Sequence, residues 1–245
     1  MHTDDDDEII GRVLSRRHAI TLLGAAGAVL TAGGGIAAGL SRPMSAVAAQ
    51  AVNCVVKPQM TQGPYYVDEG LNRSDIRTDP SDGSSVAGIK LTLNLSVLRV
   101  ASSCAPLQGA TVDLWQCDAY GRYSDVAANN TVGKKFLRGY QVTDASGVAT
   151  FVTVLPGWYT GRTVHFHIMI RTASGGSTYK FTSQLFFTEA FKASYFTQQP
   201  YVSRGMPNTT NARDGIYNNG GSQMLLTPAA VSGGYTADFA VGLNL

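Results

Sequence analysis

Apolar and polar residues alternate along several short segments of the chain, and this alternation predicts strands. The clearest case is 90–100, where Leu91, Leu93, Leu95 and Val97 occupy every second position. A period of two places the alternating side chains on opposite faces of a strand. One short helix is expected at 188–196, and 200–221 reads as a long loop rich in Asn and Gly. Further strands are predicted at 111–117, 139–143, 148–154, 163–172, 181–187, 223–227 and 237–245.

Turn-forming residues separate these segments. Residues 144–147 are expected to close a hairpin between the strands on either side of them. Residues 174–177 should turn the chain so that 181–187 runs antiparallel to 163–172. Many short strands with turns between them predict an all-β protein, a β-sandwich of mixed and antiparallel strands.

The N-terminal residues have the order of an export signal. An acidic run at 1–8, expected to be disordered, precedes Arg16-Arg17, a Gly- and Ala-rich apolar segment, and the small residues Ala46-Val47-Ala48. The arginine pair resembles twin-arginine signals. We therefore expect 1–48 to be a leader, and 49–245 to be an exported domain without stable membrane association after cleavage. An uncleaved membrane anchor is the alternative, because the apolar segment is nearly long enough to span a bilayer.

Charge and cysteine content add two expectations. The net charge of +2 gives no reason to expect a nucleic-acid partner. An oxidising compartment favours a disulfide among the three cysteines. Cys54 and Cys104 lie in loop-like stretches, whereas Cys117 lies in a predicted apolar strand. We therefore predict a Cys54–Cys104 disulfide and a buried free thiol at Cys117; three free thiols are the alternative.

The predicted strand around Phe166 carries the main chemical signal. His165 and His167 lie two positions apart, so they point to the same face about 6.6 Å apart along the backbone. That spacing lets two imidazoles bind one metal at about 2.0–2.1 Å each. The other histidines, His2 and His18, fall in the predicted leader. The alternative is an ordinary polar pair on a solvent-facing strand.

Several blocks in this chain, in the same order, resemble the intradiol ring-cleavage dioxygenases, and the likeness is closest to exported members. These non-haem iron(III) enzymes open catechols between the two hydroxyls. Residues 61–66 match the family pattern (T/E)-x-G-P-(F/Y)-(F/Y), and residues 115–123 match W-x-x-(D/N)-x-x-G-x-Y. Residues 156–159 match the segment that carries the second tyrosine ligand. Residues 162–167 match R-x-x-H-x-H, and residues 182–187 match T-x-Q-x-(F/Y)-F.

The resemblance implies an enzyme that uses O2 to cleave a catechol-type diol to a cis,cis-muconate-type product. It implies that Tyr159 leaves the metal and takes up a proton when the diol binds. It also implies that Arg162 stabilises developing charge and that Gln184 is a hydrogen-bonding group near the substrate. Because Arg162 lies three residues before His165, a turn must redirect its side chain into the pocket. The resemblance implies one iron(III) per chain, bound by two tyrosines and two histidines: Tyr123, Tyr159, His165 and His167.

Two other functions fit parts of the pattern. An exported β-sandwich module that binds aromatics or sugars without catalysis would explain the many tyrosines and Trp158. A zinc or copper site on the two histidines is the other, although hydrolytic zinc usually adds a carboxylate or a third histidine. The sequence leaves open the natural catechol, a homo-oligomer, and a pocket role for Tyr65 and Tyr66.

Overall fold

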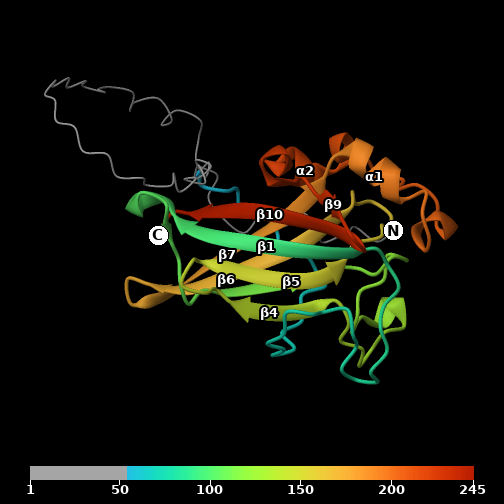
Figure 1. The fold of residues 1–245 in the computed structure, drawn as a ribbon, viewed down its shortest axis with the longest axis horizontal. Helices are drawn as coiled ribbons and strands as arrows, with labels where there is room; N and C mark the ends of the chain where they lie inside the picture. Colours follow the sequence, from blue (N-terminus) through green and yellow to red (C-terminus); the bar gives the residue numbers. More distant parts are fainter. Residues whose placement is uncertain (1–53) are drawn as a thin grey trace, which may run out of the picture. The chain divides into compact units, whose positions relative to one another are not determined.

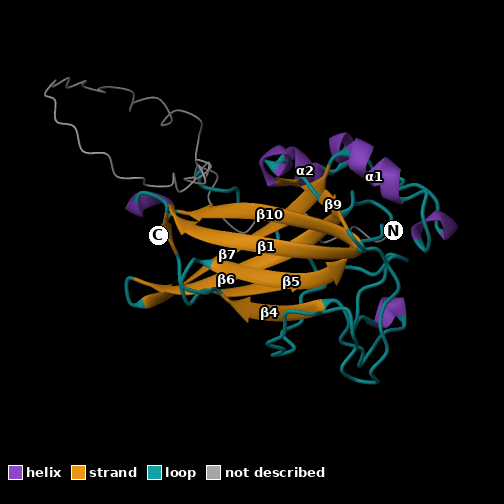
Figure 2. Cartoon of the chain, viewed as in Figure 1, coloured by secondary structure: helices purple, strands orange, loops and turns teal. Residues whose placement is uncertain are grey.

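The structure is a computed structural model that describes residues 54–245 (Figure 1). The predicted leader lies outside the described residues. Two five-stranded sheets form the framework of the described chain, and α1 and α2 lie near each other at one side of it (Figure 2). The expectation of an all-β sandwich is confirmed.

The first sheet is mixed and is built around β1 (Lys90–Arg99). This strand pairs in parallel with β10 (Gly234–Leu243) and antiparallel with β5 (Val148–Val154). The short β9 (Ala229–Val231) lies antiparallel to β10, and β2 (Ala105–Pro106) pairs with the end of β1. Because β1 has partners on both sides, its alternating leucines are held with one face toward the core.

The second sheet holds the two histidines near its middle. Its strand order is β4-β3-β6-β7-β8, with antiparallel neighbours except for the parallel pair of β7 and β8. The predicted return of the chain after the histidine strand is confirmed, since Ser174 pairs with Ser177 across a two-glycine turn. The strands are β4 (Arg138–Val142), β3 (Thr111–Trp115), β6 (His165–Ser174), β7 (Ser177–Phe187) and β8 (Leu225–Leu226).

The predicted hairpin at 144–147 is wrong. Its two flanking strands belong to different sheets, because β4 pairs with β3 and β5 pairs with β1. The turn therefore carries the chain from one layer to the other. A tight turn shows only that the chain reverses direction, and each of these two strands pairs along its length with a strand elsewhere. Cys117 also lies two residues beyond the end of β3 rather than within it.

The predicted helix is confirmed as α1 (Glu189–Tyr195), whose first turn is capped by the Thr188 side chain. The predicted long loop after it is not irregular throughout, since it contains α2 (Gly215–Asn218), which is capped by Asp214. Such short turns have too few residues for a periodic pattern. Single 3-10 turns lie at Val100–Ser102, Ala127–Asn129, Tyr201–Ser203, Asn211–Arg213 and Gly221–Met224.

Apolar side chains cover both faces of β6. Phe166, Ile168 and Ile170 join the main core, which also contains the inward residues of β1. On the opposite face, Met169 packs in a second apolar cluster with Trp115, and Tyr65 and Tyr66 lie against this cluster. This burial on both faces explains why the sequence around β6 is almost continuously apolar.

The cysteine prediction is confirmed. Cys54 and Cys104 form a disulfide, with their Cα atoms 5.7 Å apart. Cys117 is a buried free thiol. Within residues 54–245, the helices are too short or too polar to cross a membrane.

Candidate metal and substrate site

His165 and His167 point together to the outer face of the second sheet, where loops cover them. Their side chains are buried, with 2% and 1% of the residue surface exposed, so the solvent-facing alternative is wrong. Their Nε2 atoms lie 3.0 Å apart. The Nδ1–H of His165 donates to the Thr163 carbonyl oxygen at 2.6 Å, which leaves the Nε2 lone pair of His165 directed into the cluster.

The structure brings both predicted tyrosines to these rings. The Tyr123 Oη lies 3.4 Å from the His165 Nε2, and the Tyr159 Oη lies 3.3 Å from the same atom. Ligands about 2.1 Å from one metal and about 90–120° apart stand roughly 3.0–3.6 Å from each other. The three separations from the His165 Nε2 fall in that range, as expected for donors that share one metal ion.

The tyrosines come from two loops that touch through glycines. A Cβ on Gly121, whose φ is +80°, would stand 2.1 Å from the Trp158 carbonyl oxygen. A Cβ on Gly157 would stand 2.5 Å from the Asp118 carbonyl oxygen, to which the Gly157 N–H donates at 3.0 Å. The glycines therefore allow the backbones before Tyr123 and Tyr159 to meet.

Asp118 shapes the first of these loops. Its Oδ1 accepts from the backbone N–H groups of Tyr120 and Arg122, each at 2.9 Å. Its Oδ2 accepts two further hydrogen bonds from the Arg122 guanidinium. These bonds close a tight loop before Tyr123, which gives a physical reason for the spacing from aspartate to glycine to tyrosine in this block.

Burial controls the protonation of the donors. Desolvation, with a further contribution from Arg162, lowers the pKa of His165 to about 3. Burial and the neighbouring His165 lower the pKa of His167 well below its ordinary value. Burial, together with nearby Tyr159, raises the pKa of Tyr123 well above its ordinary value. Neutral imidazoles are ready to bind a metal, whereas a buried phenolate needs a nearby cation.

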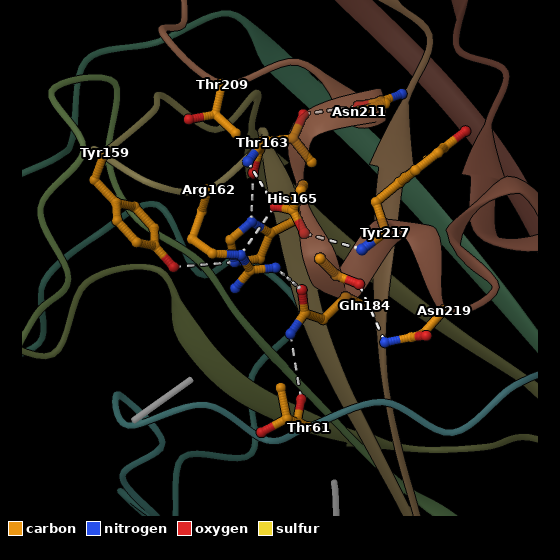
Figure 3. A network of polar contacts seen from close by, with 12 residues as sticks. Thr61, Tyr159, Arg162, Thr163, His165, Gln184, Thr209, Asn211, Tyr217 and Asn219 are labelled. Carbon is orange, nitrogen blue, oxygen red and sulfur yellow. Dashed lines mark hydrogen bonds and ion pairs between the residues drawn. The ribbon is translucent and has the colours of Figure 1, made fainter. Parts of the chain in front are cut away.

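The redirected arginine is found as predicted. The regular strand begins only at His165, and Gly161, with φ of +91°, makes the turn before it. The Arg162 side chain is buried beside the cluster, and its Nη2 donates to Gln184 Oε1. Gln184 lies opposite His167 in the β6–β7 register, and its Nε2 donates to the Thr61 carbonyl oxygen at 3.3 Å (Figure 3).

Sequence reasoning missed Trp115 as a neighbour of the site and left a pocket role for Tyr65 open. Trp115 stacks on the His167 ring, with centroids 4.9 Å apart and planes 8° apart. Tyr65 stacks on Tyr123 at 4.7 Å and meets Tyr159 edge-on, so it borders the site. Trp115 and Tyr65 stand inside blocks that the resemblance had marked, and that position could have identified them.

The other missed neighbour is Asp214, whose Oδ2 accepts from Arg162 Nε at 2.9 Å. This residue comes from a segment rich in Asn and Gly far along the chain, and no sequence pattern marks it. Among residues 54–245, no group of three or more His, Cys, Asp or Glu side chains could hold a metal ion. Within the described chain, the additional donors close to His165 and His167 are therefore the tyrosines.

Comparisons with known proteins agree with a dioxygenase. A comparison with curated protein sequences found no match. An intradiol ring-cleavage dioxygenase from Tetranychus urticae is similar in structure at 29% identity and a TM-score of 0.68, covering 78% of this chain and 95% of that chain. The dioxygenase domain of a carbohydrate-binding fusion from Streptomyces sp. SirexAA-E has 29% identity and a TM-score of 0.57, covering 78% and 99%.

A more distant structure shares the fold. The 3-chlorocatechol 1,2-dioxygenase from Rhodococcus opacus 1CP has 22% identity and a TM-score of 0.54, covering 75% of this chain and 71% of that chain. The fold and the buried tyrosine–histidine cluster thus define a β-sandwich protein of the intradiol dioxygenase type. The sequence model of the family described as dioxygenase matches residues 61–203. The chain belongs to this family.

Proposed function

We propose that this protein is an iron(III) intradiol dioxygenase that cleaves catechol-type diols between the two hydroxyls with O2. The observation that carries the proposal is the convergence of two phenol oxygens and two imidazole nitrogens from three chain segments. Tyrosinate and neutral imidazole are a suitable donor set for iron(III), since hard anionic oxygens stabilise the higher oxidation state. We propose one iron(III) per chain.

The donors around the cluster suit different tasks. Iron(III) held there would withdraw electron density from a bound diol and so make its ring reactive toward O2. Tyr123 is 1% exposed and stacked under Tyr65, so it remains in place. Tyr159 is half-buried at the edge of the cluster, where its oxygen can turn away and accept a proton from the diol.

Arg162 supplies a fixed positive charge beside the cluster. Burial opposes its ionisation, but Tyr159 and Asp214 raise the pKa of Arg162 above its ordinary value, so it stays charged. A charge held in place stabilises negative charge that develops on the ring without reorganising. Gln184 fixes one end of the guanidinium and is itself held by the Thr61 carbonyl oxygen.

The decisive experiment combines colour, iron content and product. Purified protein should contain about one iron per chain and show the burgundy band of tyrosinate-to-iron(III) charge transfer. Plain catechol should give a muconate that carries both atoms of 18O2. A yellow semialdehyde product would mean extradiol cleavage, and binding of aromatics without iron or turnover would favour the binding-module alternative.

Variants assign the donors. His165→Ala should lose most of the iron and the colour, whereas Tyr159→Phe should shift the band and keep some iron. Tyr120→Phe is the matched control, because Tyr120 is 40% exposed on the same loop as Tyr123 and should leave the spectrum unchanged. Full iron occupancy in His165→Ala would refute the ligand assignment.

We also propose that the protein is exported through a twin-arginine signal and cleaved after Ala48. The support is Arg16-Arg17 and the small residues Ala46-Val47-Ala48. A Cys54–Cys104 disulfide suits an oxidising compartment. N-terminal sequencing of the exported protein should start at Ala49; a full-length form that stays in the membrane would refute cleavage.

A further inference from the structure

We infer that Asp214 is a positioning residue that fixes Arg162 and the entry into the histidine strand, and so controls turnover without touching the metal. The expected effect of Asp214 on turnover rests on the proposed function. Asp214 lies beyond the segment 61–203 that matches the family. A carboxylate from the C-terminal part of the chain thus completes a site whose other parts lie within that segment.

Asp214 is held at both oxygens. Its side chain is fully buried, and Oδ2 accepts from Arg162 Nε at 2.9 Å and from the Thr163 N–H at 2.7 Å. Its Oδ1 accepts from the Tyr217 N–H at 2.9 Å and so caps α2. With both oxygens bound to fixed donors, the carboxylate has one orientation.

The shared oxygen links the arginine to a metal donor. Thr163, whose N–H binds Asp214, also presents the carbonyl oxygen that accepts from His165 Nδ1 at 2.6 Å. Figure 3 shows Arg162 and Thr163 beside the His165 ring. One carboxylate oxygen therefore restrains both the guanidinium and the backbone N–H of Thr163, the residue whose carbonyl oxygen orients the imidazole.

A second set of contacts holds the same turn from its other side. The Thr163 hydroxyl donates to Asn211 Oδ1 at 2.7 Å and accepts from the buried Lys192 Nζ at 2.7 Å. Glu189 accepts from Lys192 Nζ and from the Asn211 N–H. Thr163 is thus held from both sides, by Asp214 at its N–H and by this network at its hydroxyl.

Hydrogen bonds to Asp214 and Gln184 hold the guanidinium from different directions. Its Nε donates to Asp214, and its Nη2 donates to Gln184. Gln184 is neutral, so of these two hydrogen-bond partners Asp214 is the one that places a negative charge on the buried cation. Burial opposes ionisation of the carboxyl, but Arg162 and the two backbone donors hold the pKa of Asp214 below its usual range. Without that charge, the guanidinium should turn toward other oxygens and leave its productive orientation.

The test uses Asp214→Asn in the iron-loaded enzyme, with Asp238→Asn, the same change at an exposed carboxylate on β10, as the control. Asp214→Asn should keep its iron and lower kcat by roughly 10–100-fold, with a smaller change in KM. In an Arg162→Ala background, adding Asp214→Asn should lower kcat by a smaller factor than it does in the wild type, because one of the two groups that Asp214 positions is gone. Asp238→Asn should remain within about 2-fold of wild type. Wild-type kcat in Asp214→Asn, or a full further loss in the double variant, would overturn the inference.

A crystal structure separates this inference from the proposed function. In Asp214→Asn, the Arg162 guanidinium should change rotamer or occupy two positions, whether or not any catechol is turned over. An unmoved Arg162 overturns the inference, while wild-type protein that contains no iron and cleaves no diol overturns the proposed function. If Asp214→Asn does not fold, the test uses Asp214→Glu, which retains the charge on a longer side chain. This variant should also displace Arg162, and an unmoved Arg162 in its structure would count against the inference.

Discussion

Replacing Gly121 by alanine should separate the two loops that carry the tyrosines. The position has φ of +80°, and an added Cβ would stand 2.1 Å from the carbonyl oxygen of Trp158. The loop cannot simply retreat, because the Gly121 N–H donates to the Asp118 carbonyl oxygen at 3.0 Å. Tyr159 directly follows Trp158, so moving that peptide changes the tyrosine as well.

The cost can be worked from two contributions. A left-handed conformation costs a residue with a Cβ about 1–2 kcal/mol. Relieving the contact to at least 3.0 Å requires a backbone shift of 3.0 − 2.1 = 0.9 Å, and overpacking of this kind costs about 1–3 kcal/mol. We therefore expect Gly121→Ala to lower the free energy of unfolding by about 2–5 kcal/mol.

Gly133→Ala is the matched control. Gly133 has φ of +79°, but a Cβ there meets no atom of residues 54–245 within 4 Å. Its cost should be the conformational part alone, about 1–2 kcal/mol. Urea unfolding measures both variants, and iron content with the charge-transfer band reports the site. The free energies of unfolding of Gly121→Ala and Gly133→Ala are then compared. If they agree within about 0.5 kcal/mol and Gly121→Ala keeps the wild-type spectrum, the contact between the loops does not hold the tyrosines together.

Three other predictions concern stability. The Cys54–Cys104 disulfide closes a sequence separation of 50 residues, so removing it should cost about 4 kcal/mol in urea unfolding, and denatured, unreduced protein should label one thiol, Cys117. Burial raises the pKa of Asp113 to about 6, so this carboxyl takes up a proton on folding. The free energy of unfolding should therefore fall as pH rises from about 4 to 6, and Asp113→Asn should flatten the plot of that free energy against pH in this range. Lys192→Met should cost about 1–3 kcal/mol, because its buried oxygen partners lose their donor, and a thermal midpoint equal to wild type would contradict this.

The elements with strong local patterns were predictable from the sequence. The alternation of 90–100 gave β1 within one residue, and the two histidines on one strand face gave the shared direction of their rings. The turn before Arg162 was also predictable, because a regular strand would have pointed this side chain away from His165. These features depend on periods of a few residues, which a single sequence displays directly.

Features that depend on distant partners were not predictable. The partners of β4 and β5 are decided by which strand each one contacts in the folded sandwich, whereas the short turn between them suggested that they pair with each other. The contact of Asp214 with Arg162 joins residues that are 52 positions apart. Neither relation leaves a periodic trace in the chain, so only the folded structure reveals it.

The positions of these groups suggest how metal binding and turnover can vary separately. The proposed donors lie within the segment that matches the family, where tight loops and strand register set their places. Asp214 reaches the same site from outside that segment and touches Arg162 and the Thr163 N–H, not the donor atoms. Under the proposed function, substitutions at Asp214 would therefore alter the charge beside the substrate while the proposed metal donors stay intact. Substitutions at Gly121 should act in the opposite way, because they move the tyrosine-bearing loops and leave the Arg162–Asp214 pair in place.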